Sequence, residues 1–395
     1  MAEMGKHSFY SVLDRDSRYI IKVCYFIFSI SGLFVISLDT IMPLLSIEYN
    51  LSHTFSGMLI SAARTGNFIA GILAGILPIY IGRKNTIMLF YACLMFGLAT
   101  IILTGNPYLL LFGFAFAGLT RGGASNFNNA VVNEVSNSSP MALGFLHGSF
   151  AIGAIIAPLF IILAGNLSGN NGWRLALLVI IALAALSVFL ISKMKLPHND
   201  VHGNRKQQLS YDFLKNRKFI LSMIIFFLYY SFESGVSGWL VKYFVETEII
   251  KKDLVQITAS ILWGGILVSR FACAVIGTRY SGKAMLITLG SGSIAFFVLM
   301  IATKNPVVIT VAITGLGLFM GGIYQTIISA SGGILKKYPM ALSTILTVGN
   351  IGGILMPFIA GVFSDLSGIF AGMVSIGITG LLILVFSAFL KTSEQ

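Results

Sequence analysis

The stretch Gly153-Ala-Ile-Ile-Ala-Pro158, followed by Asn166-Leu-Ser-Gly169, recurs 199 residues later as Gly352-Gly-Ile-Leu-Met-Pro357, followed by Asp365-Leu-Ser-Gly368. The same offset relates residues of other segments: Gly118, Gly122 and Gly123 to Gly317, Gly321 and Gly322; Asn126 to Gln325; Ser61 and Gly66 to Ser260 and Gly265; and Lys84 to Lys283. A constant offset across separate segments indicates an internal repeat. In membrane proteins, two similar halves are typical of carriers that alternately expose a site between the halves.

The composition is that of a membrane protein. Of the 395 residues, 56% are hydrophobic and only 10% are charged, which a soluble domain of this length cannot bury in its core. The three cysteines, Cys24, Cys93 and Cys273, lie in apolar runs, so no disulfide framework, metal site or redox centre is indicated.

Segments of about 20 apolar residues are needed to cross a bilayer. The first such segment follows a polar stretch, lacks a small-residue cleavage pattern and is too long for a signal-peptide core, so we expect it to be retained as a helix. The sequence predicts twelve spans, at about 21–45, 54–80, 86–104, 107–134, 141–165, 172–193, 219–245, 256–278, 283–303, 305–333, 340–364 and 367–390.

The distribution of basic residues predicts the orientation. Of the 26 lysines and arginines, 18 fall on the side that holds the two termini and the even-numbered loops, and five fall on the other side, with Lys242 counted among these five. Basic loops face the cytoplasm, so both termini are predicted to be cytoplasmic. The net charge of +12 is explained by this topology, and no nucleic-acid partner is expected.

We predict an all-α membrane protein of two pseudo-symmetric halves: a six-helix half at residues 1–194, a cytoplasmic linker at 195–218 and a second six-helix half at 219–395. The linker contains His198 and His202, whose spacing of four residues would suit a metal on a helix. Pro197 and Gly203 oppose a stable helix there, so a solvated linker is predicted instead.

Two acidic residues fall inside predicted spans: Asp39 in the first and Glu233 in the seventh. An ionisable group at this depth is costly and needs a partner, an aqueous cavity or a function. A carboxylic acid in a partly dry cavity can change its protonation state as the cavity opens from one side to the other, which is what proton coupling requires. The alternative is a structural pair with an arginine.

Three arginines are similarly placed: Arg64, Arg121 and Arg270. Each can neutralise an acid or bind an anionic solute with its planar set of donors. We expect Arg64 to serve structure or gating, and Arg270 to extend toward the interface or to brace a gate. In the fourth span, Arg121 begins a polar stripe at helical spacing, which either lines a cavity or holds helices together by hydrogen bonds; the stripe continues through Ser125, Asn128 and Asn129.

Further polar and aromatic residues within spans are candidates for solute binding. His147 suits a proton relay, although a hydrogen-bonded structural histidine is an equal alternative. Aromatic rings with amides are the groups that bind sugars, but Trp and Tyr also collect at membrane interfaces. The remaining candidates for the site are Trp239, Tyr324, Gln325 and Asn350.

Twelve spans in two halves, a central linker and Gly82-Arg-Lys84 after the second span resemble the major facilitator superfamily over the whole chain. The resemblance implies the fold of that superfamily and a gating role for Arg83 and Lys84 in this loop. Ile79 stands where the family usually has an acid. Pro158 and Pro357 are expected to shape helices, and the antiporter motif of the fifth span is only half present around Pro158.

Within that superfamily, the chain resembles the fucose-galactose-glucose:proton symporter group. The resemblance is carried by Asp39-x3-Pro43 on the first span, by Gly118-Leu-x2-Gly122 with Asn129-Ala-Val on the fourth, and by Glu233-x4-Gly-Trp239 on the seventh; it extends to Trp263–Arg270 and to spans around Gly315 and Ile323–Ile327. We expect Asp39 to carry the coupling proton, and Glu233 either to assist it or to bind hydroxyl groups of the solute. Ser125 aligns with an acid of fucose permease, which makes a sugar acid or another small anion an alternative solute.

The expected function is proton symport of a small polar solute, a sugar or sugar acid, by alternating access in the bacterial inner membrane. The alternatives are a proton-antiport exporter of sugars or small organic compounds, a small-anion carrier, and sodium in place of the proton. No nucleophile and base, metal-ligand spacing or phosphate loop is evident, so no enzymatic activity and no cofactor are expected. The expected partners are the solute and membrane lipid, and the protein is expected to be a monomer.

Overall fold

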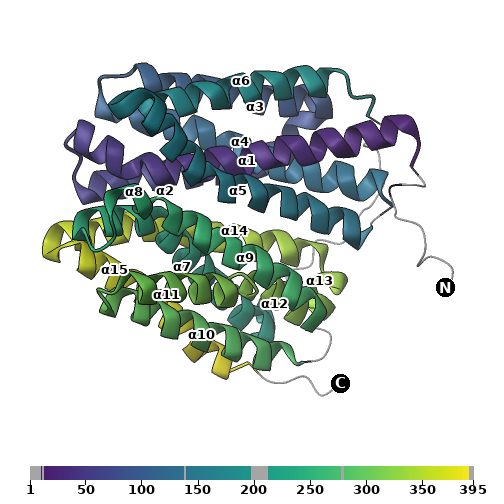
Figure 1. The fold of residues 1–395 in the computed structure, drawn as a ribbon. Helices are drawn as coiled ribbons and strands as arrows, with labels where there is room; N and C mark the ends of the chain where they lie inside the picture. The colour runs from purple at the N-terminus through teal and green to yellow at the C-terminus, as the bar shows by residue number, and fades with distance from the viewer. Residues whose placement is uncertain (1–9, 11–12, 138, 197–211, 277–279, 391–395) are drawn as a thin grey trace. The chain divides into compact units, whose positions relative to one another are not determined.

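The computed structural model describes residue 10 and residues 13–137, 139–196, 212–276 and 280–390. In these ranges all regular structure is helical (Figure 1). The long helices are α1 (Arg15–Glu48), α2 (His53–Ile81), α3 (Arg83–Leu103), α4 (Pro107–Val135), α5 (Pro140–Ser168), α6 (Gly172–Ser192), α7 (Arg217–Thr247), α9 (Ile257–Ile276), α10 (Gly282–Ala302), α11 (Pro306–Met320), α14 (Pro339–Ser367) and α15 (Ile369–Ala388). The short helices are η2 (Gly169–Asn171), η3 (Asp212–Lys215), α8 (Lys252–Val255), α12 (Ile323–Ala330) and α13 (Gly332–Lys337).

The described residues confirm the twelve predicted spans. Nine segments among them are long and apolar enough to cross a membrane, and one of these, Met141–Ser192, comprises both α5 and α6. The other two spans are α9, whose apolar part is shorter, and α4, which carries the polar stripe. The tenth span differs from the expectation, because the helix is interrupted at Gly321 and Gly322 and continues as α12.

The repeat extends to the ends of the helices. Asn106 and Asn305, which are 199 residues apart, each precede a proline and accept a hydrogen bond from a backbone N–H of the first helical turn. Both residues therefore cap their helices in the same way. The far ends of α5 and α14 are closed by Gly169 and Gly368, whose φ angles of 57° and 83° favour glycine.

Repeated glycines mark the same close helix contacts in both halves. A Cβ on Gly66 would lie 2.0 Å from the carbonyl oxygen of Ala115, and one on Gly265 would lie 2.8 Å from that of Thr314. Ala115 and Thr314 are themselves 199 residues apart. Small residues let helix backbones approach closely in membranes, so the repeated glycines preserve equivalent packing of α2 with α4 and of α9 with α11.

The chain forms two compact units. The first comprises residues 1–38 and 65–204, and in it α3 packs against α4 and α6. The second comprises residues 39–64 and 205–395, and in it α7 packs against α14 and α15. The last part of α1 and the first part of α2 thus group with the C-terminal helices. The division of the chain into 1–194, 195–218 and 219–395 stays a prediction, and His198 and His202 lie outside the described residues.

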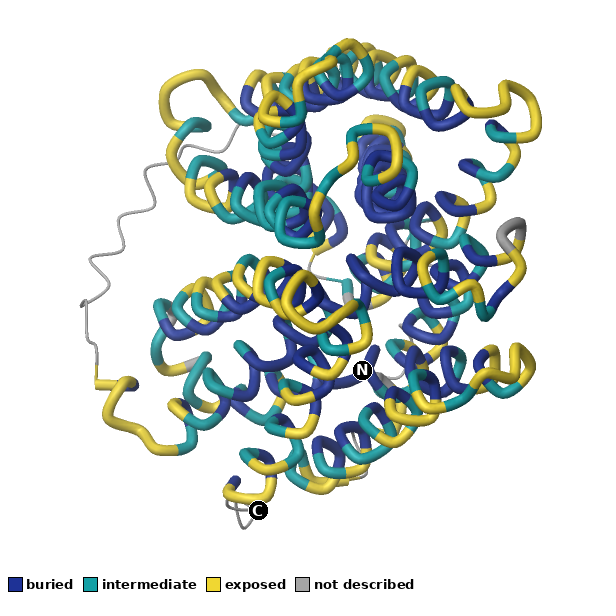
Figure 2. The backbone as a smooth tube through the Cα atoms, turned by 90° about the vertical axis from the view of Figure 1, so that its left-hand side faces the viewer, coloured by how far each residue is buried: buried dark blue, intermediate teal, exposed yellow. Residues whose placement is uncertain are grey.

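Burial distinguishes α1 and α7 from the other helices. The residues of α7 between Ser222 and Phe244 are mostly buried, so α7 is the central helix of the second unit. Elsewhere buried and exposed positions alternate along the helices (Figure 2), and the exposed positions include large apolar residues such as Phe96, Phe112 and Phe189. An apolar exterior of this kind is suited to lipid.

Lys242 changes one count in the prediction of topology. It is among the five basic residues counted on the side opposite the termini, but it is buried inside α7 with only 2% of its surface exposed. The predicted seventh span, at about 219–245, contains this position, but the sequence did not indicate that the hydrogen-bond partners of the lysine come from other helices. The difference in basic residues between the two sides becomes larger without it.

Candidate functional site

Asp39 and Arg64 form an ion pair inside the second unit. Asp39 on α1 is 7% exposed, and its Oδ2 accepts a hydrogen bond of 3.3 Å from Nη2 of Arg64 on α2. The Nε of Arg64 donates to the hydroxyl of Ser234 on α7 at 3.2 Å, and that hydroxyl donates to the carbonyl of Gly353 on α14 at 2.9 Å. One arginine therefore connects the acid of the first span to two C-terminal helices.

A parallel contact lies one turn from Arg64 on α2. The hydroxyl of Ser61 donates to the carbonyl of Ile354 at 2.6 Å. Neighbouring carbonyls of α14, those of Gly353 and Ile354, thus accept from α7 and α2 respectively. Two residues of α2 are therefore linked to α14: Ser61 directly, and Arg64 through Ser234.

The second predicted acid, Glu233 on α7, lies beside Arg270 on α9. Oε1 of Glu233 is 3.9 Å from Nη2 of Arg270, and the side chains are 17% and 21% exposed. The guanidinium of Arg270 also lies over the ring of Trp263, 6.0 Å from its centre. The two acids therefore have different arginine partners, and Arg270 contacts an acid within the unit instead of reaching for the membrane surface.

Tyr324 belongs to an aromatic cluster in the same unit. Its ring centre is 5.4 Å from that of Phe226 and 6.3 Å from that of Tyr230. Tyr324 lies on α12, directly after the interruption at Gly321 and Gly322. Aromatic rings in a concave site supply apolar faces on which a sugar ring can lie.

In the first unit, Arg121 on α4 lies over the ring of Phe150 on α5, 4.3 Å from its centre. The Phe150 ring packs against Phe28 of α1 at 5.4 Å, and Phe28 packs edge-on against His147 of α5 at 5.8 Å. Two predicted site residues, Arg121 and His147, are thus joined through two phenylalanines. A guanidinium on an aromatic face keeps its charge while its position is fixed.

The rest of the polar stripe bonds mainly to its own helix. Nδ2 of Asn128 donates to the carbonyl of Ala124 at 2.7 Å, and Nδ2 of Asn129 donates to that of Ser125 at 2.8 Å. Asn128 is fully buried, and within the described residues its Oδ1 has no hydrogen-bond partner. A buried amide oxygen of this kind can accept a hydrogen bond from a solute hydroxyl.

Three further candidates remain: Trp239, Asn350 and Gln325. Trp239 is buried on α7 and donates from Nε1 to the carbonyl of Pro357 at 3.2 Å, so it secures α14. Asn350 donates to the carbonyl of Leu346 on its own helix at 3.0 Å. Gln325 is half-buried on α12. Pro158 lies within α5, as Pro357 lies within α14.

The loop after α2 is held by contacts that the sequence only partly indicated. Arg83 donates to Oε2 of Glu134, at the end of α4, at 2.9 Å. Lys84 donates to the carbonyls of Ser192 and Met194 at the end of α6. A cation at a helix C-terminus satisfies its free carbonyls and stabilises its dipole. Arg83 and Lys84 therefore fasten α3 to α4 and α6.

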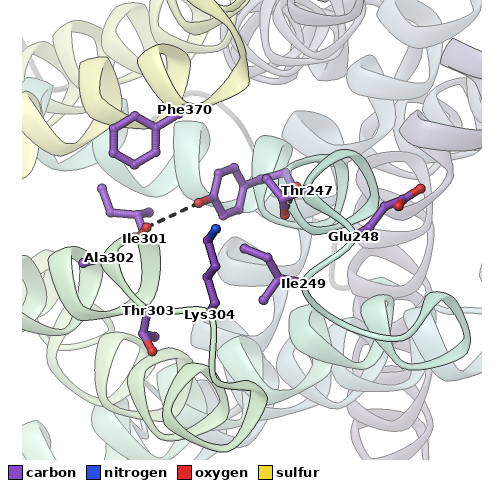
Figure 3. Close-up of a pocket in the computed structure, with 9 residues that line it drawn as sticks. Thr247, Glu248, Ile249, Ile301, Ala302, Thr303, Lys304 and Phe370 are labelled. Carbon is purple, nitrogen blue, oxygen red and sulfur yellow. Dashed lines mark hydrogen bonds between the residues drawn. The ribbon is translucent and has the colours of Figure 1, made fainter.

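A cavity of about 570 Å³ opens elsewhere in the second unit (Figure 3). It lies at the end of α7, with Tyr243 and Lys304 on opposite elements and Phe370 of α15 on its wall. The hydroxyl of Tyr243 donates to the carbonyl of Ile301 at 3.5 Å, the hydrogen bond drawn as a dashed line in Figure 3. None of the site residues predicted from the sequence lines this cavity.

Sequence reasoning missed Ser234 and Glu134. Ser234 directly follows Glu233, which drew attention to the acid, and its contact with Arg64 depends on how α2 packs on α7. A signal did exist for Glu134: an acid at the end of the fourth span, while Arg83 lacked the usual acid nearby in the loop. The ion pair supplies the missing negative charge from another helix.

The sequence is similar to a family of known proteins and to two individual proteins. Residues 24–331 match the Major Facilitator Superfamily. Bypass of stop codon protein 6 of Saccharomyces cerevisiae is 20% identical over 385 residues, covering 88% of this chain and 77% of that protein. A putative glucose/galactose transporter of Helicobacter pylori is 24% identical over 275 residues, covering 68% of this chain and 64% of that protein.

Proteins of solved structure that share this fold are named as transporters of different solutes. A D-xylose-proton symporter has a TM-score of 0.77 at 12% identity, covering 94% of this chain and 97% of that one. The nucleoside transporter NupG has a TM-score of 0.75 at 15% identity, covering 94% and 98%. The fucose:proton symporter of E. coli has a TM-score of 0.62 at 21% identity, covering 95% and 100%. At these identities the likeness shows the fold alone.

Proposed function

Because the chain belongs to the Major Facilitator Superfamily, matched over residues 24–331, we propose that it carries a sugar or sugar acid together with a proton by alternating access. It is a multi-pass membrane transporter of small molecules and not an enzyme. The proposal concerns the solute, the coupling ion and the direction of transport.

The single observation that carries the proton role is the buried Asp39–Arg64 ion pair. Asp39 is 7% exposed, and a buried charge is stable only when it is paired. Binding a proton removes the charge of Asp39 and weakens its hold on Arg64, which in turn contacts Ser234. A protonation event at one acid thereby changes contacts among α1, α2 and α7, which is the requirement for coupling an ion to a conformational change.

A sugar is the solute that the second unit suits. The carboxylate of Glu233 can accept hydrogen bonds from sugar hydroxyls, and Tyr324, Tyr230 and Phe226 supply ring faces. The similarity to a putative glucose/galactose transporter supports this class of solute.

Arg121 favours an acidic form of the sugar. Its guanidinium lies on the Phe150 ring, which leaves the planar set of donors oriented by the ring while the charge is retained. A carboxylate on the solute would pair with this charge. A carrier of other small anions is the second candidate function, and the same observation favours it.

For cellular location, we propose the cytoplasmic membrane of a bacterium, with both termini in the cytoplasm. The support is the excess of basic residues on one side of the twelve spans. This excess becomes larger when Lys242, which is buried inside α7, is left out of the count.

Uptake into proteoliposomes tests the proposal. Purified protein is reconstituted, and labelled sugars, sugar acids and nucleosides are offered with and without an imposed pH gradient, acid outside. We expect accumulation of a sugar or sugar acid above equilibrium only with the gradient, and none with an equal sodium gradient. Accumulation driven by the opposite pH gradient would establish antiport, and accumulation driven by sodium would show that the coupling ion is wrong.

A further inference from the structure

Lys242 on α7 is a buried lysine that the proposed transport site does not use. Its surface is 2% exposed, and its Nζ donates to the hydroxyl of Ser56 on α2 at 2.7 Å and to that of Ser46 on α1 at 3.1 Å. The ammonium also lies over the ring of Trp239, 5.4 Å from its centre. Lysines are rarely buried to this degree unless they are paired, so the two serines are essential partners.

The two serines are arranged to accept from a cation. Each hydroxyl can donate its hydrogen to a carbonyl of its own segment: Ser46 to Met42 at 2.8 Å and Ser56 to Ser52 at 3.0 Å. A hydroxyl has one hydrogen and two acceptor positions, so lone pairs remain for the ammonium. The two hydroxyl oxygens are 3.0 Å apart, so one ammonium group can donate to both.

Glu246 completes the surroundings of the ammonium. Its Oε1 lies 3.8 Å from Nζ of Lys242, one turn away on α7, and 3.6 Å from Nδ1 of His53 at the start of α2. Asp365 of α14 accepts from the backbone N–H groups of His53 and Thr54 at 2.9 and 2.8 Å. These contacts hold the same end of α2 to α7 and to α14. We call Lys242, Ser46, Ser56 and Glu246 the Lys242 latch.

The segment that the latch holds belongs to helices shared between the units. Residues 39–64 group with the C-terminal helices, whereas residues 15–38 of α1 and the part of α2 beyond residue 64 group with the first unit. A movement of α1 and α2 away from α7 must therefore break the contacts of Lys242 with Ser46 and Ser56. Glu246 would remain, because it lies on α7 with the lysine.

We propose that Lys242 is a positioning residue of the transport cycle. Its ammonium holds the 39–64 segment against α7 in the present state, and it exchanges the two serine hydroxyls for water when the segment moves away. The proposal rests on alternating access but not on the identity of the solute or ion. The two serines set the equilibrium between the present state and the state in which the segment has moved away. Without them, the desolvated ammonium keeps only Glu246 as an acceptor among the latch residues.

Distance measurement between spin labels tests this directly. Cysteines at Ile47 and Leu366, which are 65% and 73% exposed, carry the labels in a background that lacks Cys24, Cys93 and Cys273. Hydrogen bonds to charged groups are worth enough that losing even one shifts an equilibrium by about tenfold. We expect S46A/S56A to shift the ratio of short to long label distances toward long distances by at least about that factor.

Matched variants separate the latch from general damage. Ser187→Ala removes a buried hydroxyl that donates within its own helix to Leu183, and it should leave the distances unchanged. Ser46→Thr with Ser56→Thr keeps both acceptors and should restore the short distance. The decisive comparison repeats S46A/S56A in a Lys242→Met background, where no ammonium needs the acceptors and no further shift is expected.

An equal shift in the presence and absence of Lys242, or no shift in either background, would overturn the proposal. No solute and no gradient enter the measurement. Failure of the latch would therefore leave proton coupling at Asp39 untouched, and failure of gradient-driven uptake would leave the latch untouched.

Discussion

Nη2 of Arg64 lies 3.3 Å from Oδ2 of Asp39, while Nε of the same guanidinium donates to Ser234 at 3.2 Å. The guanidinium of Arg64 thus pairs with the acid through Nη2 and contacts α7 through Nε. A change of charge on Asp39 reaches α7 through a single side chain.

Removing one member of this pair should cost more stability than removing both charges. Arg64→Met leaves the Asp39 carboxylate in a mostly buried position without that partner, at a cost of about 1–3 kcal/mol. In an Asp39→Asn background, the same change should cost less, because no charge is left uncompensated. Apparent melting temperatures of the purified single and double variants measure the difference. Equal losses in both backgrounds would mean that the pair does not interact in the folded protein.

Arg121 should decide between neutral and acidic sugars. Arg121→Ala removes the guanidinium that lies on Phe150 and should abolish stabilisation by sugar acids while keeping that by neutral sugars. The measurement is a thermal-shift screen against sugars, sugar acids and small anions. Arg174→Ala, which removes a partly exposed guanidinium that lies over Trp173, is the matched control. Loss of all shifts in Arg121→Ala alone would place the residue in structure and not in anion recognition.

Glycines at the close helix contacts should not tolerate a methyl group. A Cβ on Gly352 would lie 2.3 Å from the carbonyl oxygen of Phe227, and one on Gly153 would lie 1.9 Å from that of Ser29. Alanine at either position should destabilise the protein by about 1–3 kcal/mol through overpacking. At Gly75, where nothing lies within 4 Å, alanine should be neutral or stabilising. The yield of monodisperse protein and its melting temperature test the contrast, which an equal loss at all three positions would contradict.

The Arg83–Glu134 pair should contribute more than a surface pair does. Its side chains are 21% and 26% exposed, whereas those of Lys195 and Asp16 are 79% and 53% exposed. Glu134→Gln should lower stability by about 1 kcal/mol, and Lys195→Ala by a few tenths at most. Raising the salt concentration should reduce the effect of Glu134→Gln only slightly, because a partly buried pair is weakly screened. If Lys195→Ala were the more damaging change, the loop would be held by other contacts.

The sequence was sufficient to predict the helices but not to predict which side chains of different helices contact each other. Apolar length placed all twelve spans, since the length of an apolar run depends on neighbouring residues alone, and the repeat indicated the two halves. The interruption at Gly321 and Gly322 could not be inferred, because the equivalent Gly122 and Gly123 lie within the unbroken helix α4. The same local pattern gives two outcomes, so the packing of each unit decides.

Pairing depends on helix tilt and depth, which the sequence does not contain. Nothing in the spacing of Asp39, Glu233, Arg64 and Arg270 indicated which acid faces which arginine. The sequence placed Lys242 within the seventh span but did not indicate its two acceptors, because these are serines of other helices. The roles of the site residues remain predictions, and the contacts described above determine which variants test them.

The central claim is that Asp39 carries the coupled proton, and the most direct measurement is proton movement itself. Proteoliposomes without any imposed gradient are given transported sugar outside, and the external pH is recorded in a weakly buffered medium. The account predicts that wild-type protein makes the medium more alkaline as sugar enters, whereas Asp39→Asn binds and exchanges sugar with no change in pH. Sugar-dependent alkalinisation of normal size with Asp39→Asn would contradict it.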